Sequence, residues 1–111
     1  MKQSTIDNDP ETCVKFVRAL MYALEAVQED RELAARILEK EFATLTEEGR
    51  AAALERAYED QLWSVDGVIS RQAVDTLMDV LLTTGLYEDD YTYEELVDMR
   101  FVDQVATEKA E

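Results

Sequence analysis

Residues 63–102 read WSVDGVISRQAVDTLMDVLLTTGLYEDDYTYEELVDMRFV, and this stretch decides the fold. An Asp66-Gly67 turn comes first, and Ser70 then precedes a run of apolar residues at helical spacing. Serine there caps a helix, and Gly85 is placed to end it in the left-handed conformation that glycine tolerates. Leu86 is available to pack back on the last turn. We expect a buried face of four side chains, Val74, Leu77, Met78 and Leu81.

A second helix signal follows the acidic residues 88–90. Thr92 and Glu95 have the spacing of a capping box, in which each side chain satisfies a backbone N–H group of the other residue. This spacing, ahead of Leu96, Val97 and Met99, predicts a short last helix and an ordered region that ends near Val105.

Three more helices are predicted upstream of this stretch. The first starts at Asp9-Pro10-Glu11, because aspartate caps, proline presets the first helical φ angle and glutamate suits the positive end of the helix dipole. A second starts at Asp30 and ends near Phe42, and Thr44 or Thr46 caps a third. The apolar stripe of the first helix comprises Val14, Val17, Leu20, Met21, Leu24 and Val27. That of the third comprises Ala51, Leu54, Ala57, Tyr58 and Leu62.

No segment shows the alternation of apolar and polar residues that is typical of a strand, so the pattern predicts an all-α fold. We expect four to five helices, joined by short loops in one compact bundle. We expect a disordered N-terminus over residues 1–8, a single helical domain over 9–105 and a frayed C-terminus over 106–111. A chain of 111 residues can bury one core without disulfides or metal, and Cys13 is its only cysteine.

The composition is strongly acidic, with 26 Asp and Glu against 11 Lys and Arg and a net charge of −15. Such a field repels phosphate backbones and anionic lipid headgroups, so the sequence excludes nucleic acid as a partner. No apolar run approaches the roughly 20 residues of a membrane span, and the N-terminus lacks the basic and apolar parts of an export signal. We therefore expect no membrane insertion. The acidic excess suits either high salt or a basic partner.

The chain contains no histidine, which removes the most frequent general base and metal ligand. The sequence offers no catalytic nucleophile together with a general base. We therefore predict no enzyme, no catalytic residue, no metal site and no cofactor. Glu25, Glu29 and Glu32 recur at helical spacing and are read as a solvated face. Residues 88–90 lack the alternating acids of a calcium loop. Cys13 is read as a core side chain rather than a nucleophile.

Trp63 is the single candidate for ligand binding. An aromatic ring near a helix end stacks on a planar molecule such as a pyrimidine; the alternative is a core anchor, since tryptophan buries a large surface. Tyr87, Tyr91 and Tyr93 lie beside acids, where they either pin the C-terminal segment or form a patch for a partner.

In their order and spacing, five segments resemble the C-terminal part of solute-binding proteins of ABC importers, in the group that captures sulfonates, nitrate or the pyrimidine precursor of thiamine. The resemblance runs from about Asp9 to Val102. It is carried by residues 9–20 (DPETCVKFVRAL), 33–38 (LAARIL), the Asp66-Gly67 turn, 81–86 (LLTTGL) and 93–98 (YEELVD).

This resemblance implies transport rather than catalysis: a two-lobed α/β receptor in the periplasm or outside the cell closes on a small-molecule ligand and delivers it to an ABC permease. The residues here correspond to the helical end of that receptor. We therefore expect this chain to act as scaffold, and we expect the ligand cleft to require the strand-bearing lobes. Some relatives consume an active-site histidine in making a pyrimidine, and that chemistry has no counterpart here. The alternative is a stand-alone acidic helical-bundle protein with an interaction or regulatory role, which self-associates as a homo-oligomer.

Overall fold

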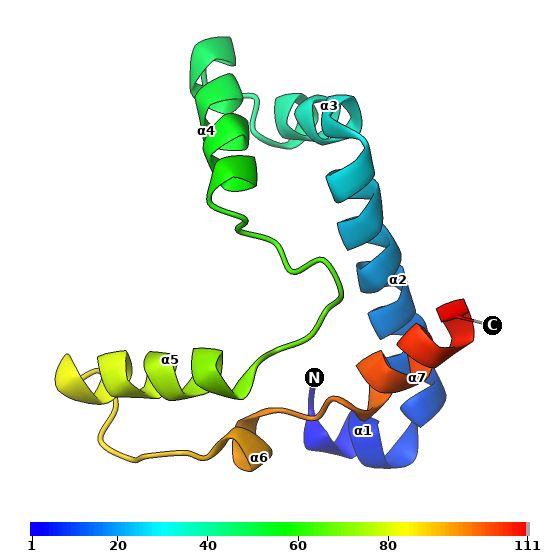
Figure 1. Cartoon of the computed structure of the whole chain (residues 1–111), viewed down its shortest axis with the longest axis vertical. Helices are drawn as coiled ribbons and strands as arrows, with labels where there is room; N and C mark the ends of the chain where they lie inside the picture. The colour runs from blue at the N-terminus through cyan, green and yellow to red at the C-terminus, as the bar shows by residue number, and fades with distance from the viewer. Residues whose placement is uncertain (111) are drawn as a thin grey trace. The chain divides into compact units, whose positions relative to one another are not determined.

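The computed structural model describes residues 1–110, and over that range it is all helical, as the sequence predicted (Figure 1). The chain divides into two compact units, Met1–Gly67 and a second that begins at Val68, where the sequence suggested a single helical domain over 9–105. The helices are α1 (Gln3–Asn8), α2 (Pro10–Glu29), α3 (Arg31–Glu41), α4 (Glu47–Glu59), α5 (Arg71–Thr83), α6 (Tyr93–Leu96) and α7 (Arg100–Ala110).

Helix α2 begins at the predicted residue. The Asp9 side chain accepts a hydrogen bond from the backbone N–H of Thr12 at 3.1 Å, and Pro10 is the first helical residue. Of the expected stripe, only Val14 and Met21 are buried, and Leu20 is 49% exposed. Cys13, read as a core side chain, is completely buried.

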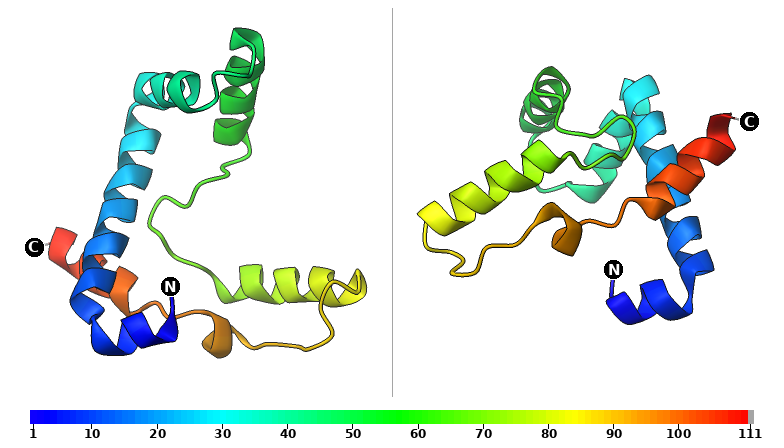
Figure 2. Two further views of the ribbon diagram at one scale, coloured as in Figure 1. Left: turned by 180° about the vertical axis from the view of Figure 1, so that it is seen from behind. Right: turned by 60° about the horizontal axis from the view of Figure 1, so that its bottom comes forward.

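The caps of α3 and α4 were also predicted. Asp30 accepts from the N–H of Leu33 at 2.9 Å, and Thr46, rather than Thr44, accepts from the N–H of Gly49 at 3.1 Å. In Figure 1, α3 crosses the end of α2 and packs against α4, and Figure 2 shows the same neighbours from two other directions. Ala34 and Ala57 are the buried residues of α3 and α4, and such small side chains let helices approach closely.

The expectation that Leu62 continues the stripe of α4 is wrong, because the helix ends at Glu59. Gln61 adopts a left-handed backbone (φ 49°), and the N–H of Leu62 bonds the Ala57 carbonyl at 3.0 Å. This is a Schellman ending, which normally uses glycine. Leu62 is 67% exposed as a result.

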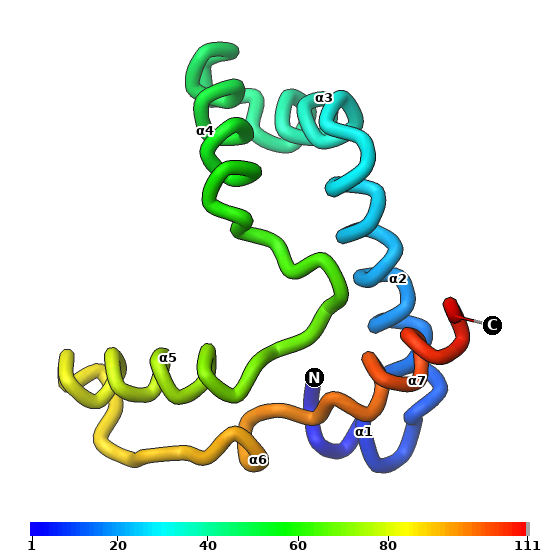
Figure 3. Tube along the Cα trace, in the orientation of Figure 1, coloured from blue at the N-terminus to red at the C-terminus, as the bar shows by residue number. Residues whose placement is uncertain are grey.

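In the second unit, Ser70 caps α5 by accepting from the N–H of Ala73 at 3.1 Å. Gly85 (φ 68°) ends the helix, and the N–H of Leu86 bonds the Leu81 carbonyl at 3.0 Å. The expected packing of Leu86 on the last turn is wrong, since that side chain is 72% exposed. The backbone then doubles back to α6, as Figure 3 shows.

Two of the four expected core side chains of α5 are buried, Val74 and Met78. Leu81 is half-buried, and Leu77 is 53% exposed, which contradicts its place in the buried face. The reason is angular: at 100° per residue Leu77 lies at the edge of the stripe that the other three define.

Both ends of the described chain carry a helix where the sequence suggested disorder or fraying. In α1, the Gln3 side chain donates to Asp7 at 2.8 Å and Asn8 donates to the Ser4 carbonyl at 2.7 Å. In α7, Gln104 donates to Glu108 at 3.1 Å. These side-chain bonds one turn apart stabilise both helices, and α7 also buries Phe101 and Val105.

Many large apolar side chains stay in contact with solvent. Each of the following is at least 45% exposed: Phe16, Leu20, Ile37, Phe42, Leu45, Leu62, Val65, Val68, Ile69, Leu77, Val80, Leu86 and Leu96. Within residues 1–110, no helix combines the length and the apolar character that crossing a membrane requires.

Candidate functional site

Trp63, the predicted ligand-binding residue, lies in the loop after α4 and is half-buried. Its ring meets the edge of the Tyr58 ring, with centroids 5.1 Å apart and an angle of 70° between the planes. This T-shaped arrangement is a favourable geometry for two aromatic rings. The structure thus shows an anchoring contact for Trp63, and its role in ligand binding stays a prediction.

Tyr58 connects Trp63 to the rest of the first unit. Its hydroxyl donates a hydrogen bond to the carbonyl of Val27 at the end of α2, and the guanidinium carbon of Arg31 lies 4.2 Å from the ring centroid. A cation over an aromatic face is attracted to it. Helices α2, α3 and α4 are therefore linked through one tyrosine, and the position of Trp63 depends on it.

The turn after Trp63 is built by Ser64. Its hydroxyl oxygen accepts from the N–H of Gly67 at 2.8 Å and lies 3.1 Å from an Asp66 carboxylate oxygen, to which it donates. Gly67 has φ 75°, a conformation that glycine adopts readily. The Asp66-Gly67 turn predicted from the sequence is confirmed, and it fixes where the chain leaves the aromatic contact.

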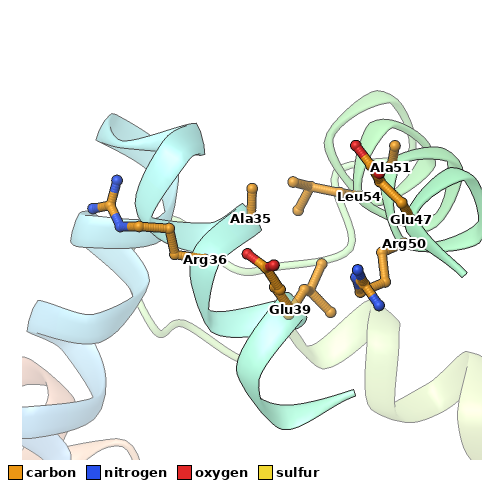
Figure 4. Close-up of a pocket in the computed structure, with 8 residues that line it drawn as sticks. Ala35, Arg36, Glu39, Glu47, Arg50, Ala51 and Leu54 are labelled. Atoms are coloured by element: carbon orange, nitrogen blue, oxygen red, sulfur yellow. The ribbon is translucent and has the colours of Figure 1, made fainter. Parts of the chain in front are cut away.

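A pocket of about 370 Å³ lies between α3 and α4, away from Trp63 (Figure 4). Its apolar lining comes from Ala35 and Leu38 on α3 and from Ala51 and Leu54 on α4. The hollow exists because alanine occupies both helices where a larger side chain would fill the space. Sequence reasoning did not identify this pocket.

Four charged residues complete the lining: Arg36, Glu39, Glu47 and Arg50. Figure 4 shows Arg36 directed away from α4, and its guanidinium lies 4.0 Å from Asp30 and 3.9 Å from Glu32. The Arg50 guanidinium donates to the carbonyl oxygen of Leu45, in the loop between the two helices.

In the second unit, an ion pair joins the start of α5 to α6. Arg71 donates to both carboxylate oxygens of Glu94, one of them at 3.1 Å, and its guanidinium carbon lies 4.7 Å from the Tyr93 ring centroid. The Tyr93 hydroxyl donates to the Ile69 carbonyl at 2.8 Å. Tyr93 therefore pins the C-terminal segment with its ring and hydroxyl, one of the two roles that the sequence suggested.

The other two tyrosines of that group, Tyr87 and Tyr91, form a T-shaped pair with centroids 6.0 Å apart. The capping box is present too, since the Glu95 carboxylate accepts from the N–H of Thr92 at 2.8 Å. Both features order the return from α5 to α6.

The Arg71–Glu94 pair predicts an acid-dependent loss of stability. Hydrogen bonds from the Arg71 guanidinium lower the pKa of Glu94 from 4.5 to about 2. Because the folded pKa is depressed, the stabilisation is present above the unfolded pKa and is lost as pH falls through the folded value. We expect Arg71→Met to weaken the α5–α6 contact at neutral pH and to flatten the decline of the urea midpoint between pH 4.5 and about 2.

The matched control is Arg56→Met in the first unit, whose guanidinium pairs with Asp60 one turn away on the same helix. We expect it to leave the acid dependence unchanged. The Arg71–Glu94 pair is exposed, so solvent screens its charges. Identical pH profiles for Arg71→Met and the parent chain would contradict a stabilising role for the pair.

No three side chains of the types His, Cys, Asp and Glu gather as potential metal ligands within the described residues. No family model, no curated protein and no solved structure matches the chain.

Proposed function

We propose that this chain is the C-terminal helical portion of an ABC-importer solute-binding protein. In that role it is not catalytic, and it takes part in the capture of a small molecule such as a thiamine precursor, a sulfonate or nitrate. The whole receptor would act in the periplasm or outside the cell and would pass its ligand to an ABC permease.

The observation that carries the proposal is the order of the elements. Helices α2, α3 and α4 are followed by the Asp66-Gly67 turn, by α5 with its Gly85 ending and by the short helix α6. The segments that resemble the importer receptors occur in this order, each on the type of element that the resemblance needs. Residues 9–20 and 33–38 lie on α2 and α3, apart from the cap Asp9, and residues 81–86 contain the end of α5.

The surface also supports a scaffold role. Side chains such as Leu62, Val65 and Leu86, between 67% and 72% exposed, are apolar surface that further protein would cover. Strand-bearing lobes of a receptor are protein of that kind. Ligand affinity would then come mainly from lobe closure, with Trp63 as the one residue of this chain that we propose contacts a planar ligand.

Isolation of the native polypeptide that contains this sequence tests the proposal. Peptides from residues 63–102 identify it in a digest, and intact mass spectrometry then gives its size. We expect a mass well above the 12.7 kDa of these 111 residues, with strand-forming sequence on the N-terminal side of α1. A native polypeptide of 12.7 kDa would contradict the receptor proposal.

The same exposed apolar side chains favour a second candidate, a stand-alone acidic helical protein with an interaction or regulatory role. Their burial in a homo-oligomer would remove apolar surface from water. A native mass of 12.7 kDa together with self-association in sedimentation experiments would support this candidate. The net charge of −15 opposes association, so added salt should strengthen it.

A further inference from the structure

Helix α5 carries an apolar face that stays largely exposed. Ala73, Leu77 and Val80 recur along it at steps of four and three residues, so at 100° per residue they lie on one side of the helix. All three are exposed, Leu77 to 53% and Val80 to 51%, and the half-buried Leu81 borders the same side. A seam between two packed helices has this spacing. The face therefore offers a contact surface for a second helix.

The segment after α5 is acidic, and the chain does not neutralise it. Glu88, Asp89 and Asp90 are consecutive and exposed, and they begin four residues after Thr84, the C-cap of the helix. Within residues 1–110, none of the three takes part in an ion pair. Figure 1 shows this segment leading from the end of α5 to α6. Three adjacent carboxylates are therefore available next to the end of the apolar face.

No basic residue lies between residues 72 and 99, whereas this stretch contains eight acids. They are Asp75, Asp79, Glu88, Asp89, Asp90, Glu94, Glu95 and Asp98. The arginines on either side are already engaged. Arg71 pairs with Glu94, and Arg100 pairs with Asp98 at 2.6 Å. The last turn of α5, the negative end of the helix dipole, also has no basic side chain. Charge complementarity therefore selects a basic partner for this face.

We propose that this face of α5 binds an amphipathic basic helix of a protein partner. In this complex, apolar side chains of the partner helix cover Leu77 and Val80, and its lysine or arginine side chains meet residues 88–90. The proposal is independent of the receptor proposal, because it rests on α5 and the acids that follow it and not on the resemblance to importer receptors.

Three synthetic peptides of about 20 residues, long enough to form a helix, test the proposal on the 111-residue chain. The first has leucine and lysine in an amphipathic helical pattern, the second has the same composition in scrambled order, and the third has glutamate in place of lysine. Fluorescence anisotropy of the labelled peptides gives their affinities. We expect saturable binding of the first peptide, about tenfold weaker binding of the second and no binding of the third. Equal binding of the first two, binding of the glutamate peptide, or no saturation with the first would overturn the proposal.

Leu77→Ser and Leu20→Ser separate this face from apolar surface elsewhere. Leu77 is 53% exposed and Leu20, on α2, is 49% exposed, so the two variants replace similarly exposed leucines. We expect Leu77→Ser to weaken binding of the amphipathic lysine peptide about tenfold and Leu20→Ser to leave it unchanged. A thermal melt identifies any variant that does not fold, and Val80→Ser tests the same face a second time. Equal affinities of the folded variants would place the peptide elsewhere and contradict the proposal.

Two double variants with the same change in net charge test the acidic segment. Asp89→Asn with Asp90→Asn removes two carboxylates beside the face, and Glu47→Gln with Glu48→Gln removes two from the first turn of α4. We expect the first double variant to weaken binding of the lysine peptide about three- to tenfold and the second to leave it unchanged. Equal effects would show that only the general acidic field attracts the peptide, and the proposed site would be wrong.

A second copy of the chain is the competing occupant of this face. Sedimentation of the chain without peptide tests it, because association through α5 would be lost in Leu77→Ser. We expect Leu77→Ser to sediment as the parent chain does. A parent oligomer that Leu77→Ser dissociates would assign the face to a second copy and overturn the proposal.

Discussion

Replacement of Cys13 by aspartate is expected to remove a large part of the stability of the first unit. The Cys13 side chain has no solvent exposure, so an ionised carboxylate at this position would have neither water nor a partner cation. An unpaired buried charge destabilises by about 3–5 kcal/mol, against a total of about 5–15 kcal/mol for a typical domain.

Phe16→Asp is the control for this prediction. It introduces the same carboxylate one turn further along α2, at a side chain that is 54% exposed. We expect a change within about 1 kcal/mol for this variant. Urea unfolding followed by circular dichroism measures both. If Cys13→Asp unfolded at the same urea concentration as Phe16→Asp, Cys13 would not be a core residue in solution.

Tyr58→Ala is expected to destabilise the first unit by about 2–4 kcal/mol, because truncation of a large aromatic side chain removes packing and leaves a cavity. Here it also removes the contact with Trp63, the cation contact with Arg31 and the hydrogen bond to the Val27 carbonyl. Tyr58→Phe removes only the hydrogen bond and should cost about 1 kcal/mol.

Trp63 reports directly on this change, since it is the only tryptophan of the chain. We expect its fluorescence in Tyr58→Ala to shift towards that of solvated indole, and to remain near the parent value in Tyr58→Phe. Unchanged emission in Tyr58→Ala would contradict an anchoring contact between the two rings. The Trp63 position would then be determined by the Ser64 turn alone.

The starts of α2, α3, α5 and α6 and one helix end were predictable because their signals are local. Asp9, Asp30, Ser70 and the Thr92–Glu95 pair satisfy backbone N–H groups within three residues, so their sequence spacing is sufficient. Gly85 was identified for the same reason. The end of α4 was missed because Gln61 occupies a left-handed position in which glycine would have been the signal.

Burial was less predictable than helix position. A helical period identifies an apolar face, but which part of that face another element covers depends on tertiary packing, as Leu20 and Leu77 show with exposures near one half. The α3–α4 pocket could not be predicted from the sequence for a related reason. Ala35 and Ala51 have no distinctive pattern in the sequence, and the hollow arises only when two helices place them across from each other.

A ligand-dependent thermal melt of the native polypeptide that contains residues 63–102 tests the central proposal most directly. The panel comprises thiamine pyrimidine precursors, sulfonates and nitrate. The account predicts that one compound, at 100 times its dissociation constant, stabilises that polypeptide by about 2.7 kcal/mol, whereas the 111-residue chain alone, as scaffold, is not stabilised. A native polypeptide whose cooperative melt is moved by no compound of the panel would contradict the assignment of this chain to a receptor for such ligands.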